Sequence, residues 1–516
     1  MKPCKSLMFL AGVLALLYGF RLLQNECGGR GHQSLDIPHD NIARQENQPS
    51  LGLEDSLIQL YRSIYRLPEQ NPNQERLQGI PIVAFEYDSA GRGSLLLENF
   101  FIKLLEISHP DQTTRLQHWY PEPFAWNGGF SEKRPSFSRI LYYGDASIQN
   151  DRISGTLRQL LQTDFGGFGP GILPLSSLMP CDPKENSRQC AIRKEGAWQE
   201  ISAVSSMRQG NYGILSSYLS APFYQASPPS RQETGTVRIE LPLFLQHHDG
   251  LCLEVFAHKD VLANDIHVSV QKQPSSDREP VPAASTLTGP GQKRFTYALP
   301  RDFQNISFQM KFKRNRNLYA LALNDTTGIC VDNLCLPESK GRVFSVNNRR
   351  FLTDQLDLAN AGLILYQFGY QLPAPIDSSR TEEACRQFRF QLLQELSYIR
   401  SLLPATPVIV VGVSDFSEHF GVSTAFSGHR PERDLSSEAL RQIQKEAAFQ
   451  TDCVFWNPSR ALEACPPTID KADLTAMLFY QALMDAYRLF LKKELRTMSL
   501  QRAKSLELNT YSRQSR

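Results

Sequence analysis

The sequence carries almost no net charge and little that would bind a metal. Lys and Arg total 55 and Asp and Glu total 53 in 516 residues, which leaves a net charge of +2. So small a charge over this length gives no electrostatic footprint for nucleic acid, and we expect no nucleic-acid partner. Neither a CxxC pair nor a histidine cluster supports a zinc site, and nothing in the sequence indicates a cofactor.

Long apolar runs are also missing, except at the N-terminus. Lys2 and Lys5 precede an apolar run of 14 residues, Leu7–Phe20. This length matches the core of a signal peptide and is short for a membrane span of ~20 residues. Residues 1–27 are therefore interpreted as a signal peptide or an uncleaved signal anchor, with a buried helix as the third alternative. The basic start places the body outside the cytoplasm, in the periplasm or cell envelope, and an uncleaved segment would anchor it to the inner membrane.

The cysteines agree with export from the cytoplasm. Of ten cysteines, eight follow Cys27. Three pairs lie close together in the sequence, and local disulfides are predicted for them because an oxidising compartment favours such bonds. The pairs are Cys181 with Cys190, Cys330 with Cys335, and Cys453 with Cys465.

The middle of the chain has a different hydrophobic pattern from its flanks. Residues 28–54 are polar without apolar periodicity, which predicts a linker. From about 198 to 323, the alternation in TVRIEL, LCLEVFA, DIHVSV, ISFQMKF and LYALAL predicts the short strands of a β-sandwich. The stretch QKQPSSDREPVPAASTLTGPGQ predicts a long polar connection inside it.

The flanking regions alternate helical and strand patterns. Helical spacing occurs in SLLLENFFIKLLEI and in Arg152–Gln162, and the runs AGLILYQFG and TPVIVVGVSD are typical of buried parallel strands. A last helix is expected from about Asp473 to Leu495. The length also requires more than one core. We therefore predict an α/β fold, a doubly wound parallel sheet with halves at 55–195 and 326–500, an inserted β-sandwich at 196–325 and a polar tail at 501–516.

One stretch, YGDASIQNDRISGTLRQLLQTDFGGFGPG, resembles the first block of the SGNH (GDSL-like) hydrolases. It is most similar to the bacterial extracytoplasmic branch that includes peptidoglycan and polysaccharide O-acetylesterases. Members of that branch also carry a β-sandwich insertion like a carbohydrate-binding module. GICVDNL and LILYQFGYQ resemble later blocks, and the similarity covers most of Arg139–Tyr487.

The resemblance implies that the four catalytic letters of the family are replaced here. The nucleophilic serine falls on Ala146, the oxyanion-hole glycine and asparagine fall on Cys335 and Gln371, and the base histidine falls on Asp473. No histidine follows His429. A methyl group cannot attack an acyl carbon, and a hydroxyl is a poor nucleophile without a base. We therefore expect an inactive SGNH-like protein.

The alternative is an active carbohydrate O-acetylesterase or acetyltransferase with a relocated site. Ser147 lies one residue beyond Ala146, and His419 or His429 would be its base. Their simpler interpretation is a helix-capping serine and two solvated loop histidines. Asp145 is expected to hydrogen-bond the backbone amides of the turn.

The expected partners are a cell-envelope glycan or an active member of an acetylation system. Flat aromatic side chains bind sugars, and the candidates are Trp119, Tyr120, Trp126 and Tyr212. Packing of these rings onto the sheet is the simpler interpretation. The glycines of FGGFGPG either cradle an anion or end a helix and turn the chain. A structural envelope protein without glycan affinity is the third functional alternative.

Overall fold

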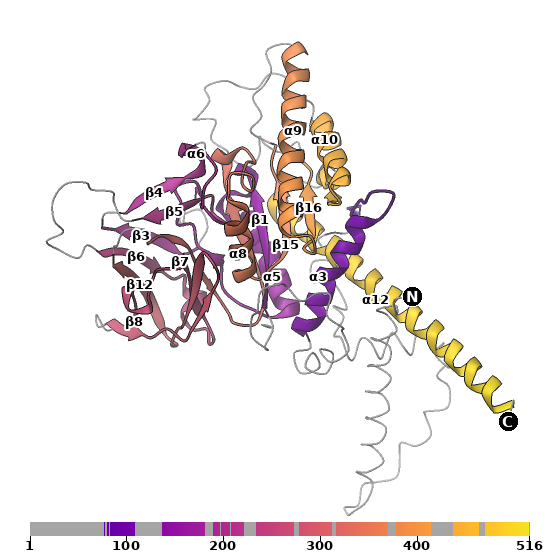
Figure 1. The fold of residues 1–516 in the computed structure, drawn as a ribbon, viewed down its shortest axis with the longest axis horizontal. Coiled ribbons are helices and arrows are strands. Elements are labelled where there is room, and N and C mark those ends of the chain that lie inside the picture. Colours follow the sequence, from indigo (N-terminus) through magenta and orange to yellow (C-terminus); the bar gives the residue numbers. More distant parts are fainter. Residues whose placement is uncertain are drawn as a thin grey trace, which may run out of the picture. The chain divides into compact units, whose positions relative to one another are not determined.

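The computed structural model describes residues 77, 80, 81, 83–108, 137–180, 189–196, 198–206, 208–220, 234–272, 278–311, 316–369, 378–413, 437–463 and 470–514 (Figure 1). The predictions for 1–54 and for Trp119, Tyr120, Trp126, Gln371, His419 and His429 lie outside these residues. The chain divides into two units, and the larger contains Asn71–Ile107 and Pro135–Leu483. No helix among the described residues is long and apolar enough to cross a membrane.

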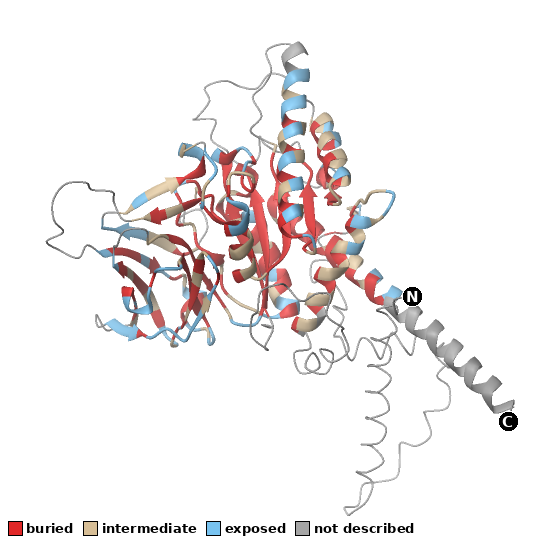
Figure 2. Ribbon diagram, in the orientation of Figure 1, coloured by how far each residue is buried: buried red, intermediate tan, exposed pale blue. Residues whose placement is uncertain are grey.

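A parallel sheet of five strands forms the centre of the larger unit. Its order is β14-β1-β15-β16-β17, and every neighbouring pair is parallel. All side chains of these strands are buried except one at intermediate exposure, as the apolar runs predicted (Figure 2). The strands are β1 (Phe137–Gly144), β14 (Gly328–Cys335), β15 (Ala361–Gln367), β16 (Val408–Val411) and β17 (Val454–Trp456).

Helices pack beside these strands where the sequence predicted an apolar face. In α5 (Arg152–Phe165), Ile153, Leu157 and Leu161 are buried, and the helix packs against β14. The predicted helix over SLLLENFFIKLLEI is confirmed as α3. The remaining bounds are α3 (Arg92–Ser108), α8 (Arg349–Leu358), α9 (Ser378–Leu402), α10 (Ser437–Gln450) and α11 (Ser459–Glu463).

The last helix is longer than the sequence predicted. α12 runs over Lys471–Gln514, whereas the expected end was Leu495. The continuation follows from the absence of Gly and Pro across this range, since these are the residues that most strongly break helices. Asp470 caps the start, accepting a hydrogen bond from the Ala472 amide at 2.7 Å. Residues of this helix from Met484 onward belong to the smaller unit.

Between β1 and β14 the chain forms two antiparallel sheets. One has the order β10-β11-β7-β13-β5-β4 with β2 paired to β13, and the other has the order β3-β6-β12-β8-β9. The strands are β2 (Gly171–Ile172), β3 (Ala191–Glu195), β4 (Gln199–Ser202), β5 (Ser217–Ser220), β6 (Thr234–Glu240), β7 (Cys252–His258), β8 (Ile266–Lys272), β9 (Arg278–Val281), β10 (Ser285–Thr288), β11 (Gln292–Ala298), β12 (Phe303–Lys311) and β13 (Leu318–Asn324).

The period-two pattern predicted five of these twelve strands, β6, β7, β8, β12 and β13. In β6, Val237 and Ile239 are fully buried while Arg238 and Glu240 are exposed, as alternation requires. The stretch predicted as a long polar connection instead contains β9 and β10. That prediction was wrong because both are edge strands with mostly exposed side chains, and an edge strand exposed on both faces carries no apolar alternation.

A buried network of charged side chains ties β1 to the antiparallel sheet that contains β7, β11 and β13. The guanidinium of Arg139 is fully buried and donates to Asp332 in β14 at 2.9 Å and to Glu254 in β7 at 2.5 Å. It also donates to Asn324 in β13, and Glu254 pairs with Arg294 of β11 at 3.2 Å. Two cations therefore neutralise two carboxylates, which is the condition under which buried charges are tolerated.

In α8, the carboxyl group of Asp357 is held in an unfavourable environment. Burial and, to a smaller extent, the nearby Asp354 carboxylate raise its pKa to about 7, while Lys103 opposes the rise. Its Oδ1 atom is buried without a hydrogen-bond partner. An unfolded aspartate titrates near pH ~4, so the folded chain holds this proton more tightly. The free energy of unfolding therefore falls as pH rises from about 4 to about 7.

The variant Asp357→Asn cannot ionise and removes this pH dependence. We expect its free energy of unfolding to match wild type at pH ~4 and to exceed it by about 1–2 kcal/mol at pH ~8. Urea denaturation at both pH values measures the difference. Glu279→Gln, at a 56% exposed side chain in β9, is the matched control and should show no such change. An equal effect of Asp357→Asn at both pH values would contradict the assignment.

Candidate functional site

Three strands of the parallel sheet end at the same level. Gly144 at the end of β1 lies opposite Cys335 of β14 on one side and Gln367 of β15 on the other. The carboxyl ends of parallel strands are where doubly wound sheets bind ligands. The segment after β1 is therefore the first place to look for chemistry.

The turn after β1 is held by the carboxylate of Asp145. This carboxylate accepts hydrogen bonds from the amide of Ser147 at 3.1 Å and from the amide of Gly369 at 3.0 Å. The Asp145 amide donates to the Gln367 carbonyl at 3.1 Å. Asp145 is 1% exposed. The prediction that it binds the backbone amides of the turn is confirmed, and it also fixes the end of β15.

The Cys335 thiol reaches the turn that carries Ala146. It donates to the Asp145 carbonyl, in the peptide group that precedes Ala146, at 3.3 Å. The Cys335 amide donates to Asn333 Oδ1 at 3.2 Å, so this amide already has an acceptor within the protein. The amide group of Asn333 donates to the carbonyl of Ile148 at 2.7 Å. The strand ends are thus joined to one another by hydrogen bonds.

Ser147 has no capping role. Asp145 is the N-cap of the 3-10 helix Ala146–Asp151, and Asp151 is the N-cap of α5, so the expectation of a capping serine was wrong. The reason is that the capping position is occupied by Asp145, whose carboxylate accepts a hydrogen bond from the Ser147 amide. Ser147 is 4% exposed, and its hydroxyl oxygen is buried without a hydrogen-bond partner.

The structure places Asp473 against α5. Asp473 lies in the first turn of α12 and accepts a hydrogen bond from the Thr156 hydroxyl of α5 at 2.5 Å. Within the described ranges, every histidine lies between His247 and His267, in the antiparallel segment. The described residues therefore bring no imidazole to the end of β1.

Sequence reasoning missed Arg158. Its guanidinium forms two hydrogen bonds to the Asp151 carboxylate, at 2.7 and 2.9 Å, and donates to the Val331 carbonyl at 2.6 Å. Asn150 and Asp151 both have positive φ, near 60°. In the sequence, only the seven-residue spacing between Asp151 and Arg158, which equals two helical turns, indicated that these two side chains could pair.

A small cavity lies beside these residues. It measures ≈ 30 Å³ and is lined by Asn150, Asp151, Arg158, Asn333 and Cys335 together with residues 170, 172–174, 179, 180, 189 and 190. A cavity of this size holds about one water molecule.

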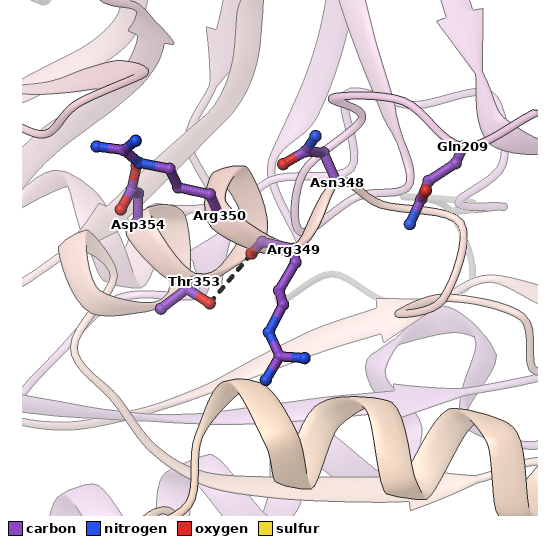
Figure 3. A pocket seen from close by; sticks show the side chains of 6 residues that line it. All are labelled: Gln209, Asn348, Arg349, Arg350, Thr353 and Asp354. Atoms are coloured by element: carbon purple, nitrogen blue, oxygen red, sulfur yellow. Dashed lines mark hydrogen bonds between the residues drawn. The ribbon is translucent and has the colours of Figure 1, made fainter.

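A larger hollow lies at the start of α8 (Figure 3). It measures ≈ 500 Å³ and shares no lining residue with the strand ends. Arg349 donates to the Ser401 carbonyl at 2.7 Å, and the Thr353 hydroxyl donates to the Arg349 carbonyl at 3.1 Å, the contact drawn dashed. The lining residues are Gln209, Asn348, Arg349, Arg350, Thr353 and Asp354.

Of the four aromatic candidates for sugar binding, Tyr212 is described. It is 5% exposed, and its ring stacks on Tyr218 with centroids 6.3 Å apart. Its hydroxyl bonds to Ser206 and donates to the Arg208 carbonyl at 3.1 Å. The ring is packed inside the protein and presents no free face to a sugar.

The predicted disulfide between Cys330 and Cys335 does not form. Both lie in β14, five residues apart, so ~16 Å of extended chain separates them and their side chains point to opposite faces of the sheet. A disulfide requires Cα atoms within about 7 Å. The other two predicted pairs each have one member, Cys181 or Cys465, outside the described residues.

The glycines of FGGFGPG end a helix and allow the backbone to pack closely against two strands. Gly166 is the C-cap of α5, and its amide donates to the Gln162 carbonyl at 3.0 Å. Gly169 has a φ of 97°, and a Cβ there would lie 2.4 Å from the Leu323 carbonyl oxygen. Close backbone approach therefore explains Gly169, and the helix-ending alternative is confirmed for Gly166.

Comparison with known proteins gives distant structural likenesses. No family model and no curated protein matches the chain. A solved structure described as a peptidoglycan O-acetylesterase is 16% identical with a TM-score of 0.44, covering 70% of this chain and 92% of that chain. A family two carbohydrate esterase from Cellvibrio japonicus is 9% identical with a TM-score of 0.21, covering 58% and 99%.

A GDSL-like lipase from Bacteroides ovatus is 8% identical with a TM-score of 0.18, covering 59% of this chain and 98% of that chain.

Proposed function

We propose that this chain is a non-catalytic, SGNH-hydrolase-like protein of the cell envelope. It has a doubly wound parallel sheet with an inserted β-sandwich. It binds a glycan, or assists an active partner in O-acetylation or deacetylation of polysaccharide or peptidoglycan. The observation that carries the proposal is the turn after β1. There Ala146 follows Asp145, the Asp145 carboxylate is engaged by backbone amides, and the Cys335 thiol donates to the Asp145 carbonyl.

The chemistry of acyl transfer explains why this geometry supports inactivity. Attack on an ester needs an activated nucleophile, a base that accepts its proton and donors that stabilise the oxyanion. The resemblance assigns the nucleophile to Ala146, which has no hydroxyl. The amide of Cys335, the corresponding oxyanion donor, bonds instead to Asn333. The cavity beside them has room for about one water molecule.

The envelope location rests on the sequence. Two lysines followed by the apolar run Leu7–Phe20 match an export signal or anchor, and the positive-inside rule then places the body outside the cytoplasm. The glycan or acetylation partner rests on the resemblance of the first block to envelope O-acetylesterases. Trp119, Tyr120 and Trp126 remain proposed sugar contacts.

One observation favours the second candidate function, an esterase with a relocated nucleophile. The Ser147 hydroxyl is buried and has no hydrogen-bond partner, so it is not committed to a structural bond. His419 and His429 follow β16, whose carboxyl end belongs to the same sheet edge. A proton acceptor from that segment would complete a serine and base pair.

Labelling with a fluorophosphonate separates the two candidates. This reagent phosphonylates serines activated by a base, and mass spectrometry locates the modified residue. We expect no label on Ser147 in the full chain under conditions that label an active serine esterase completely. A stoichiometric label on Ser147 that disappears in Ser147→Ala would establish the relocated nucleophile and overturn the proposal.

A further inference from the structure

The glycine-rich segment places one aromatic ring at the surface. Phe168 lies between Gly167 and Gly169, and added Cβ atoms at these glycines would meet the backbone of Ile329 and Leu323 within 2.6 and 2.4 Å. The Phe168 carbonyl accepts a hydrogen bond from the Asp325 amide at 2.9 Å. The backbone on both sides of Phe168 is thus fixed, and its half-buried ring is held in one place.

The ring of Phe168 is the centre of an aromatic surface. It stacks on His248 with centroids 3.5 Å apart and planes 10° apart, and it meets Phe244 edge to face at 6.1 Å. Phe244 is 51% exposed and the adjacent Leu243 is 75% exposed. Beneath them Leu245 is fully buried, so the short helix α7 (Leu243–Gln246) holds its exposed pair rigidly.

The rim of this surface is polar and has no positive excess. His247 pairs with Asp302 at 2.8 Å, and Arg301 pairs with Asp249. All four side chains are at least half exposed. With a neutral histidine the rim carries a formal charge of −1, which does not attract an anionic membrane or a nucleic acid.

We infer that Phe168, Leu243, Phe244 and His248 form a binding surface for a neutral pyranose glycan. Exposed aromatic faces pack against the apolar C–H faces of sugar rings, and paired carboxylate, imidazole and guanidinium groups hydrogen-bond neighbouring hydroxyls. Three apolar side chains and one imidazole fall far short of the roughly 20–30 residues a side of a stable protein interface. This inference rests on the proposed glycan-binding function and gives it a location in the antiparallel segment.

Co-sedimentation of the full chain in mild detergent with insoluble glycans tests the surface. The probes are peptidoglycan sacculi and chitin. We expect wild type to sediment with at least one of them, and Phe244→Ala with Leu243→Ala to weaken retention about tenfold. Both side chains are exposed, so thermal unfolding of the double variant should match wild type. Phe390→Ala and Leu262→Ala, at residues 70% and 53% exposed elsewhere, are the matched controls.

The outcomes separate the two proposals. Retention that is equal in wild type and the double variant would overturn the surface and leave the glycan-binding function in place. No retention of wild type on either polymer would overturn glycan binding itself. A dimer that depends on Phe244, detected by sedimentation without glycan retention, would replace the glycan with a second copy of the chain.

Discussion

Replacement of Arg139 by Met is expected to destabilise the protein by about 3–5 kcal/mol. The change keeps a long apolar side chain in the fully buried position and removes the guanidinium. Asp332 and Glu254 then lose the cation that neutralises them, and Asp332 is itself fully buried. Urea denaturation followed by circular dichroism measures the loss.

Two further variants identify the cause. Arg238→Met removes an equivalent ion pair in β6, where Arg238 and Glu195 are each 47% exposed, and should cost at most about 1 kcal/mol. Adding Asp332→Asn to Arg139→Met should recover part of the loss, because the orphaned carboxylate is then neutral. A loss below ~1 kcal/mol for Arg139→Met would show that the network contributes little to joining the sheets.

Gly169→Ala is expected to cost about 3 kcal/mol or more, because the new methyl group meets backbone. Its Cβ would lie 2.4 Å from the Leu323 oxygen and 2.8 Å from the Asn324 Cα. Neither atom can yield unless the glycine-rich segment separates from β13. Thermal unfolding and urea denaturation both report this loss.

Gly166→Ala is the matched control. Gly166 also has a positive φ, 73°, but a Cβ there meets nothing within 4 Å. With a ψ of −177°, its conformation is one that non-glycine residues rarely adopt, so the variant should cost only this backbone strain, about 1–3 kcal/mol. Equal losses for the two variants would mean that conformational strain, and not close backbone approach, explains Gly169.

The sequence predicted those parts of the fold that hydrophobic periodicity reports directly. Buried parallel strands such as β15 and half-buried strands such as β6 differ in pattern because one has two covered faces and the other has one. The edge strands β9 and β10 lacked that signal. The buried network was also beyond prediction, since Arg139 meets its partners across 193, 115 and 185 residues of chain.

The parts of the candidate site that follow from the register of neighbouring strands could be predicted from the sequence. Ala146 lies two residues after Gly144 of β1, which lies opposite Cys335, so the two replaced positions lie at the same edge of the sheet. The hydrogen bond from the Cys335 amide to the Asn333 side chain depends on the local conformation at the end of β14, and no spacing rule indicates it. The disulfide prediction failed because proximity in sequence is not proximity in space along an extended strand.

The proposal that this chain does not catalyse acyl transfer is tested most directly by acetate release from O-acetylated peptidoglycan and from an aryl acetate. Wild type, Ser147→Ala and an active O-acetylesterase are measured side by side at equal concentration. The proposal predicts that wild type and Ser147→Ala both match the buffer rate. Release by wild type well above buffer that is abolished in Ser147→Ala would contradict it and make Ser147 the nucleophile.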